Sequence, residues 1–213
     1  EVVRKKVLGP AGSTLTLTIA REGMEPFDVE IIRQSITVPS IESRMLEDNI
    51  GYVRLFIFSD TAGDELHDTL KDLLAQNPKG LILDLRNNGG GYLDSAVEVV
   101  SEFVDSGVVM YEEYGDGTRK PLNAQKGGLA KDIPLVVLVN EGSASASEIV
   151  AGAIQDLERG KLVGVTTFGK GSVQMPSTLV NDEGAVRITI ARWLTPNGRT
   201  IHGVGLTPDV EAL

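Results

Sequence analysis

The chain has 213 residues, of which 41% are hydrophobic and 23% charged, and it carries a formal net charge of −10. This length is sufficient for one good core with a small appended piece, and the composition is typical of globular proteins. The acidic balance disfavours nucleic acid as a partner, the lack of cysteine excludes disulfides and thiolate nucleophiles, and two histidines offer little material for a metal site.

The first forty residues predict the end of a helix followed by two strands. Valines at positions 2, 3 and 7 indicate a helix that stops at Gly9-Pro10, residues 13–19 alternate as a half-buried strand, and residues 27–32 form a second strand. Two strands and a helix end cannot bury a core alone. We therefore expect part of a small domain here, with its boundary between Ser35 and Ser40.

The rest of the chain alternates between strands and helices without repeats, which predicts a layered α/β or mixed α+β core. We expect strands at residues 50–58, 81–85, 133–139, 162–167 and 185–193, and helices at residues 64–76, 93–104 and directly after position 147. Residues 111–132 predict a long surface connection or a hairpin, and the residues after 196 are mostly turn. His67 lies off the leucine stripe of its helix, so we expect a solvated side chain.

Three serines, Ser143, Ser145 and Ser147, lie on the turn between the strand at 133–139 and the following helix. The free backbone N–H groups at a helix N-terminus suit an oxyanion that develops on a nearby carbonyl. The alternative is that these serines are helix caps among small packing residues. A serine becomes a nucleophile only with a base. The hypothesis that one of these serines is a catalytic nucleophile therefore depends on a second motif that supplies the base.

Lys170 is the candidate base, because it lies between two glycines after a predicted strand. A lysine is a general base only when it is neutral, so its ordinary pKa of roughly 10.4 must fall by about 3 through burial or a neighbouring cation. Gln174 could hydrogen-bond the amine without adding charge. The alternative is a surface lysine in a glycine turn.

Two other patterns are weaker. Residues 164–170 match most of the phosphate-binding loop pattern, but Gly171 stands where the pattern requires Ser or Thr, and no helix is predicted after it. Asp84 resembles the metal-binding aspartate that accompanies such a loop, but it precedes the loop, against the usual chain order. His202 and Asp209 could form a triad with a serine, but both lie in a turn-rich tail. If the serine is activated by Lys170, we expect His202→Ala to leave hydrolysis at the serine largely intact and Lys170→Ala to abolish it.

Five segments in order resemble the carboxy-terminal processing (tail-specific) serine proteases, peptidase family S41. They are residues 84–91, 143–148, 167–174, 191–198 and 205–209. The resemblance implies a nucleophile at Ser145, a general base at Lys170 and a base-positioning residue at Gln174. It also implies oxyanion donors at the backbone N–H groups of Gly91 and Ala146.

The resemblance further implies a ClpP- or crotonase-like β-β-α superhelix over residues 39–213, preceded over residues 1–38 by the C-terminal part of a PDZ domain. Substrate contacts are expected from Gly90, Tyr92 and Leu93. The partners implied are protein or peptide substrates bound by their C-terminal tails, in an extracytoplasmic compartment (periplasm or cell envelope). No metal or organic cofactor is implied, and a homo-oligomer is compatible with the resemblance.

Two alternatives to a peptidase stay open at this point. The first is a binding module on the same fold that has lost activity, which labelling of Ser145 by a serine-reactive probe would distinguish. The second is a crotonase-like acyl-thioester enzyme, because oxyanion holes recur in that fold. Such an enzyme would not require both Ser145 and Lys170.

Overall fold

The computed structural model describes residues 2–35, 39–180 and 184–212. The chain divides into two compact units, Glu1–Val38 and Pro39–Leu213. No helix of the described residues is both long and apolar enough to cross a membrane.

The first unit contains α1 (Val2–Val7), β1 (Thr14–Ile19) and β2 (Phe27–Ile32), as the sequence predicts. The two strands pair antiparallel from Thr14↔Ile32 to Ile19↔Phe27. Arg33 ties the end of the helix to this hairpin by donating to Val7 O at 2.8 Å and to Ser13 Oγ at 2.9 Å. None of the described side chains of this unit is fully buried, which agrees with the expectation that it cannot form a core alone. Its identity as part of a PDZ domain stays a prediction.

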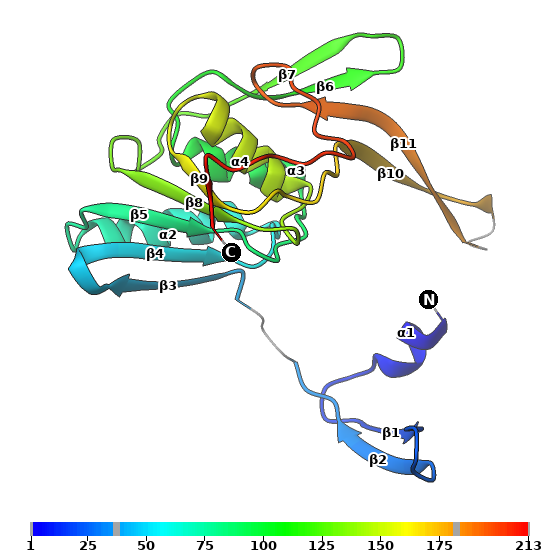
Figure 1. Cartoon of the computed structure of the whole chain (residues 1–213). Helices are drawn as coiled ribbons and strands as arrows, with labels where there is room; N and C mark the ends of the chain where they lie inside the picture. Colours follow the sequence, from blue (N-terminus) through cyan, green and yellow to red (C-terminus); the bar gives the residue numbers. More distant parts are fainter. Residues whose placement is uncertain (1, 36–38, 181–183, 213) are drawn as a thin grey trace. The chain divides into compact units, whose positions relative to one another are not determined.

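The second unit is built on a six-stranded sheet of order β12-β9-β8-β5-β4-β3 (Figure 1). Its strands are β3 (Ile41–Leu46), β4 (Ile50–Leu55), β5 (Gly80–Asp84), β8 (Leu135–Val139), β9 (Lys161–Gly164) and β12 (Val210–Glu211). All neighbouring strands are parallel except β3 and β4, which are joined by the short 3₁₀ helix η1 (Glu47–Asn49). Central strands β5 and β8 are continuous apolar runs because parallel strands are covered on both faces.

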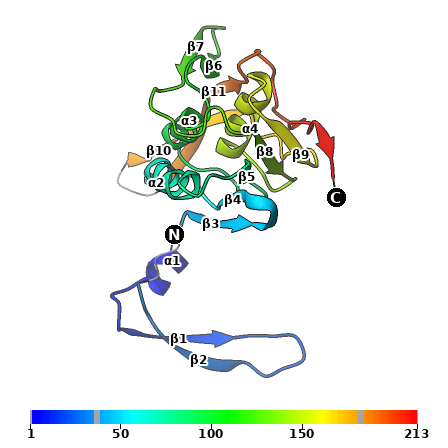
Figure 2. The same cartoon turned by 90° about the vertical axis from the view of Figure 1, so that its left-hand side faces the viewer.

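Three helices pack beside this sheet: α2 (Ala62–Leu74), α3 (Leu93–Ser101) and α4 (Ala146–Asp156). Helix α2 packs on β3 and β4, α4 contacts β9, and α3 lies against both of the other helices (Figures 1 and 2). The buried face of α2 carries Leu66, Leu70 and Leu73, the stripe read from the sequence. Helix α4 is almost wholly buried, because small residues let it approach its neighbours closely.

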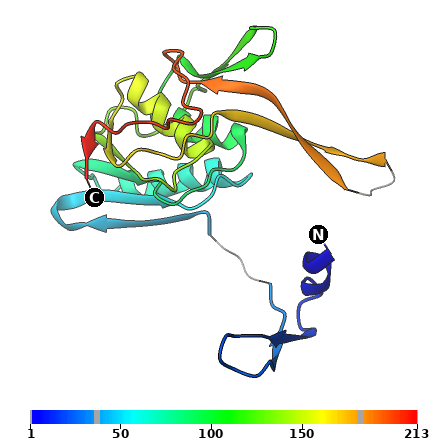
Figure 3. The same ribbon diagram turned by 45° about the vertical axis from the view of Figure 1, so that its right-hand side comes forward.

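A second sheet has the order β10-β11-β6-β7 and is antiparallel throughout. Its strands are β6 (Val108–Tyr114), β7 (Arg119–Asn123), β10 (Ser172–Thr178) and β11 (Ala185–Leu194). The pair β6–β7 confirms the hairpin predicted within residues 111–132. Figure 3 shows the long ribbon of β10 and β11 extending away from the helices, with β10 at the edge of its sheet.

Several predicted elements are wrong in extent or were missed. The strand predicted at 50–58 ends at Leu55, because Phe58 instead forms an isolated bridge with Gly91. The strand predicted at 162–167 ends at Gly164. His67 is not simply solvated: its ring lies 2.8 Å from Glu102 Oε1. Strands β3, β10 and β12 were not predicted.

Candidate active site

The three serines of the turn between β8 and α4 have different roles. Ser143 and Ser147 are fully buried, and their hydroxyls donate to Leu85 O and Asn88 O, each at 2.8 Å. Ser145 is half-buried, and its hydroxyl donates no hydrogen bond to any other described residue. The outer serines therefore fasten the turn to the end of β5, and the middle one is left available for chemistry.

Ser145 is held in an uncommon backbone conformation, with φ 57° and ψ −115°, immediately before α4. Gly90 lies directly against it: a Cβ built on Gly90 would lie 2.8 Å from Ser145 Cβ and 2.9 Å from Ala146 N. Gly90 itself has φ +99°, which side-chain-bearing residues rarely adopt. The glycine-rich loop after β5 can therefore approach the serine turn only because this position has no side chain.

Two backbone N–H groups flank Ser145 without an acceptor among the described residues. Ala146 is the first residue of α4, so its N–H is one of the unpaired donors of a helix N-terminus. Gly91 follows the glycine that contacts the serine, and its neighbours Gly90 O and Tyr92 N both bond Phe58 instead. These two donors are suited to bind a negatively charged oxygen next to the serine hydroxyl.

The loop that carries Lys170 is fastened to the serine turn by one buried carboxylate, Glu148. Its side chain is 0% exposed, and it accepts from Ser145 N at 2.9 Å and from Lys170 N at 2.9 Å through Oε2. Through Oε1 it accepts from Gly169 N at 2.7 Å and from Thr167 Oγ1 at 2.6 Å. Four donors thus converge on a single group, which fixes the candidate nucleophile and the candidate base to the same anchor.

Glu148 was not singled out from the sequence. The signal that could have found it is the capping-box pattern, a serine followed three residues later by glutamate at the start of a helix. In the usual capping box the glutamate bonds the backbone N–H of the capping serine. Here it does so and also binds a loop more than twenty residues downstream.

The far side of the lysine loop is held by residues close to the end of the described chain. Trp193 Nε1 donates to Lys170 O at 2.9 Å, and Gly203 N donates to Gly169 O at 2.9 Å. Thr167 accepts from Leu206 N at 2.8 Å through its hydroxyl. The backbone of the loop is therefore fixed on both sides.

Ser145 and Lys170 line one cleft of about 440 Å³, named here the Ser145 cleft. Its walls come from the loop after β5, the start of α4, the lysine loop and the β10–β11 ribbon. The lining residues are Gly91, Tyr92, Leu93, Ser145, Ala146, Ile149, Lys170, Ser172, Val173, Gln174, Pro176, Arg187 and Trp193. All of the site residues expected from the sequence line this cleft except Gly90, which lies behind Ser145.

The side chains of the expected dyad are not hydrogen-bonded to each other. Within the described residues, neither Ser145 Oγ nor Lys170 Nζ donates a hydrogen bond, and Gln174 makes no bond to the lysine. Gln174 is exposed and directly follows the register shift after Val173, where β11 contributes the extra, unpaired residue Ile190. The structure brings these residues to one cleft with their side chains apart.

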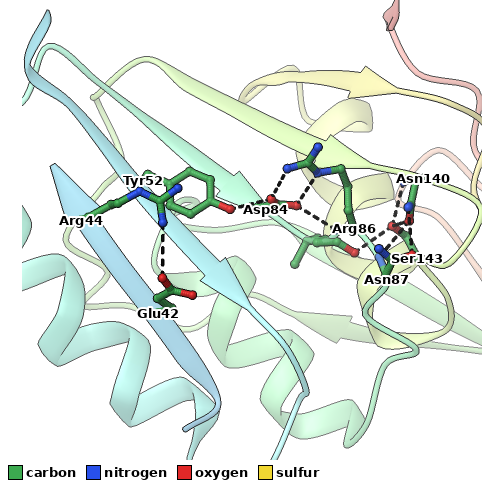
Figure 4. A network of polar contacts seen from close by, with 9 residues as sticks. Glu42, Arg44, Tyr52, Asp84, Arg86, Asn87, Asn140 and Ser143 are labelled. Atoms are coloured by element: carbon green, nitrogen blue, oxygen red, sulfur yellow. Dashed lines mark hydrogen bonds and ion pairs between the residues drawn. The ribbon is translucent and has the colours of Figure 1, made fainter. Parts of the chain in front are cut away.

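A second buried carboxylate, Asp84, supports the loop after β5 (Figure 4). Tyr52 donates to it at 2.7 Å and Arg86 at 2.6 Å and 2.9 Å. Burial alone would raise the pKa of Asp84, but the hydrogen bonds from Arg86 and Tyr52 hold that pKa below its usual range. Asn87 and Asn140 continue the network to the serine turn. Asp84 therefore anchors the loop that carries Gly90 and Gly91.

The alternative patterns read from the sequence are not assembled into sites. His202 is exposed, and Asp209 bonds Leu162 N at 2.8 Å, with no hydrogen bond joining the two. The described residues contain no group of His, Cys, Asp and Glu side chains that could hold a metal ion. Neither pattern competes with the Ser145 cleft.

Comparison with known proteins adds an independent line of evidence. The family model for peptidase family S41 matches residues 49–212. The chain is 43% identical over 210 residues to a carboxy-terminal-processing protease of Bartonella bacilliformis, covering 95% of this chain and 48% of that protein. It is 39% identical over 207 residues to the carboxy-terminal processing protease CtpA of Bacillus subtilis, covering 97% and 44%.

A solved structure, titled photosystem II D1 C-terminal processing protease, matches with a TM-score of 0.77 and 33% identity over 96% of this chain and 56% of that one. This likeness confirms the predicted mixed α/β fold class. The chain spans about half the length of the curated relatives that it matches.

Proposed function

Because this chain belongs to peptidase family S41, we propose that it is a serine endopeptidase that cleaves protein substrates near their C-termini through an acyl-enzyme. The observation that best supports this is the division of roles among the three serines. Ser143 and Ser147 use their hydroxyls structurally, whereas Ser145 lines the same cleft as Lys170 and its hydroxyl donates to no described residue. No cofactor is needed for the chemistry.

In the proposed cycle, the neutral amine of Lys170 takes the hydroxyl proton of Ser145 as Oγ attacks the scissile carbonyl. The C–N bond then breaks, and the lysine ammonium gives the proton to the leaving amine. Water attacks the ester with Lys170 again as base, which releases the new C-terminus and restores the serine. Gln174 is proposed to position the amine once substrate closes the gap between the side chains.

The oxyanion formed in each step would be bound by the N–H groups of Gly91 and Ala146. Both donors lack an acceptor among the described residues, and the contact of Gly90 with Ser145 keeps them beside the nucleophile. Fixed donors of this kind stabilise the transition state because they need no reorganisation during the reaction.

The substrate would lie extended in the Ser145 cleft and pair with the free edge of β10. Tyr92 and Leu93 would contact it on the side of α3, whereas Gly90 lies against Ser145 and does not line the cleft. We also propose that residues 1–38 are the C-terminal part of a PDZ domain that helps to bind substrate tails, and that the protein works outside the cytoplasm as a monomer or homo-oligomer.

The open gap between Ser145 and Lys170 favours one alternative, a silent binding module on the same fold. A fluorescent serine-reactive phosphonate, applied to the chain alone and with added peptide, tests the two proposals. A peptidase is expected to label at Ser145, and Lys170→Met should lower the labelling rate and peptide cleavage by about 10⁴-fold. Ser145→Ala should abolish both.

Matched controls are available in the same structure. Ser147→Ala removes a neighbouring hydroxyl and His202→Ala removes the histidine of the alternative triad, so both variants should label at Ser145 if folded. Labelling of the Lys170→Met variant at the rate of the parent chain, or no labelling of the parent under any condition, would contradict the proposed mechanism.

A further inference from the structure

The Ser145 cleft has a charge opposite to that of the chain as a whole. The chain carries a net charge of −10, but the charged side chains that line this cleft are Lys170 and Arg187, and no Asp or Glu of the described chain lines it. Lys170 has a proposed role in proton transfer, so Arg187 is the cation whose presence is not explained.

Arg187 lies on the face of β11 that turns toward the cleft. The pairing of β10 and β11 skips Ile190 between Ala191 and Thr189, so the alternation of side chains along β11 is interrupted there, and Arg187 faces the same way as Gln174 and Pro176 of β10. Ala191 and Trp193 are buried, and Trp193 lines the cleft with Arg187. Arg187 is also the register partner of Pro176 on β10, another lining residue. Its place in the cleft is therefore set by the pairing of two strands.

The guanidinium of Arg187 has no hydrogen-bond or ion-pair partner in the described parts of the chain. Several other arginines of the same unit are engaged, such as Arg86, which binds Asp84, and Arg159, which donates to three backbone carbonyls. A guanidinium presents a planar fork of donors that matches a carboxylate in bidentate geometry. The guanidinium of Arg187 is thus available to bind a carboxylate of a molecule that lies in the Ser145 cleft.

We propose that Arg187 selects peptides that carry a carboxylate on the segment lying along β10, an inference that rests on the proposed peptidase function. Pro176, its partner, lies four residues beyond Ser172, which is roughly 13 Å at about 3.3 Å per residue. An extended peptide covers that length in about four residues. The carboxylate is therefore expected about four residues along the peptide from the residue beside Ser172, either as an acidic side chain or as the chain terminus.

Binding of peptides to Ser145→Ala tests this without any bond cleavage. The probes are four fluorescein-labelled Ala/Val decapeptides: one with a free C-terminal carboxylate, its C-terminal amide, and two amides with Glu or Gln at a central position. The free acid and the Glu peptide are expected to bind about 5-fold more tightly than the neutral pair by fluorescence anisotropy. Preference for only one of them identifies the source of the carboxylate.

The preference should disappear in Ser145→Ala/Arg187→Ala, through weaker binding of the carboxylate peptides with unchanged binding of the neutral ones. Ser145→Ala/Arg192→Ala is the matched control, because Arg192 is an exposed arginine of the same strand that does not line the Ser145 cleft. It should keep the preference, and an unchanged melting temperature checks that each variant is folded. Equal binding of all four peptides, no binding of any, or a preference that survives Arg187→Ala overturns the proposal.

The result is separable from the peptidase proposal. If the wild-type chain cleaves peptides with no dependence on carboxylate or Arg187, only the selectivity inference fails. If Ser145→Ala shows the preference but the wild-type chain neither cleaves peptide nor labels at Ser145, the peptidase proposal fails and the cleft is a carboxylate-selective binding site.

Discussion

Glu148→Gln should disable the site without removing any group that reacts. Each carboxylate oxygen of Glu148 accepts two hydrogen bonds, from Ser145 N and Lys170 N on one side and from Gly169 N and Thr167 Oγ1 on the other. An amide keeps one oxygen and turns an NH₂ group toward two donors. Two hydrogen bonds to a charged acceptor are lost, at about 1.5–3 kcal/mol each.

Part of this loss is offset, because the neutral amide is easier to bury than a carboxylate. We therefore expect a net destabilisation of about 3 kcal/mol. In a domain of this size that lowers the melting temperature by about 6–12 °C. Because the side chain fixes both the serine turn and the lysine loop, kcat for peptide cleavage should fall by at least about 10²-fold at a temperature where the variant is still folded.

The two readouts are melting temperature by circular dichroism and kcat with a fluorogenic peptide. Glu148→Asp serves as the second variant, since it keeps the charge but retracts it by one methylene. The reasoning is refuted if Glu148→Gln melts within about 1 °C of the parent chain and cleaves at the parental rate.

Three further changes have distinct expected outcomes. Gly90→Ala places a methyl group against Ser145 at φ +99°, so peptide cleavage should fall by at least about 10-fold. The control Gly89→Ala meets no atom within 4 Å and should stay near parental activity. Equal rates for the two variants would contradict the contact of Gly90 with Ser145. The pKa of Asp84 is lowered by folding, so its stabilisation is present above its unfolded value of about 3.9 and is lost as pH falls through the folded one. Urea midpoints of the parent should therefore drop more steeply between about pH 5 and pH 3 than those of Asp84→Asn, and parallel profiles would argue against this origin. Arg159→Met removes donors from three carbonyls and should lower the unfolding free energy in urea by about 2–4 kcal/mol, whereas a loss below about 0.5 would show that those bonds are weak.

The sequence predicted helices and strands best where burial makes apolar residues recur at a regular spacing. Strands β5 and β8 are short apolar runs, and α2 has a leucine stripe, so each could be placed within a few residues. The three missed strands, β3, β10 and β12, are all edge strands of their sheets. An edge strand has one neighbour and a largely exposed surface, so its sequence carries no apolar alternation, and β10 even tolerates Pro176.

For the site, the sequence identified the candidate groups but not their supports. Ser145 and Lys170 belong to recognisable motifs, and their common cleft follows from the fold. The contact of Gly90 with the serine turn depends on how the loops after the neighbouring strands β5 and β8 meet. The spacing of residues in the sequence does not predict this contact. The fourfold use of Glu148 likewise depends on a loop that is distant in sequence, and Arg187 enters the cleft only through its pairing with Pro176.

The fastening of the lysine loop has a consequence for biosynthesis. A chain made from its N-terminus completes the serine turn well before the segment from Trp193 to Leu206, which holds the lysine loop from its far side. In a nascent polypeptide, the proposed nucleophile Ser145 is therefore in place before the residues that hold the loop of the proposed base, Lys170. Under the proposed mechanism, the dyad would be complete only after those residues have emerged and folded.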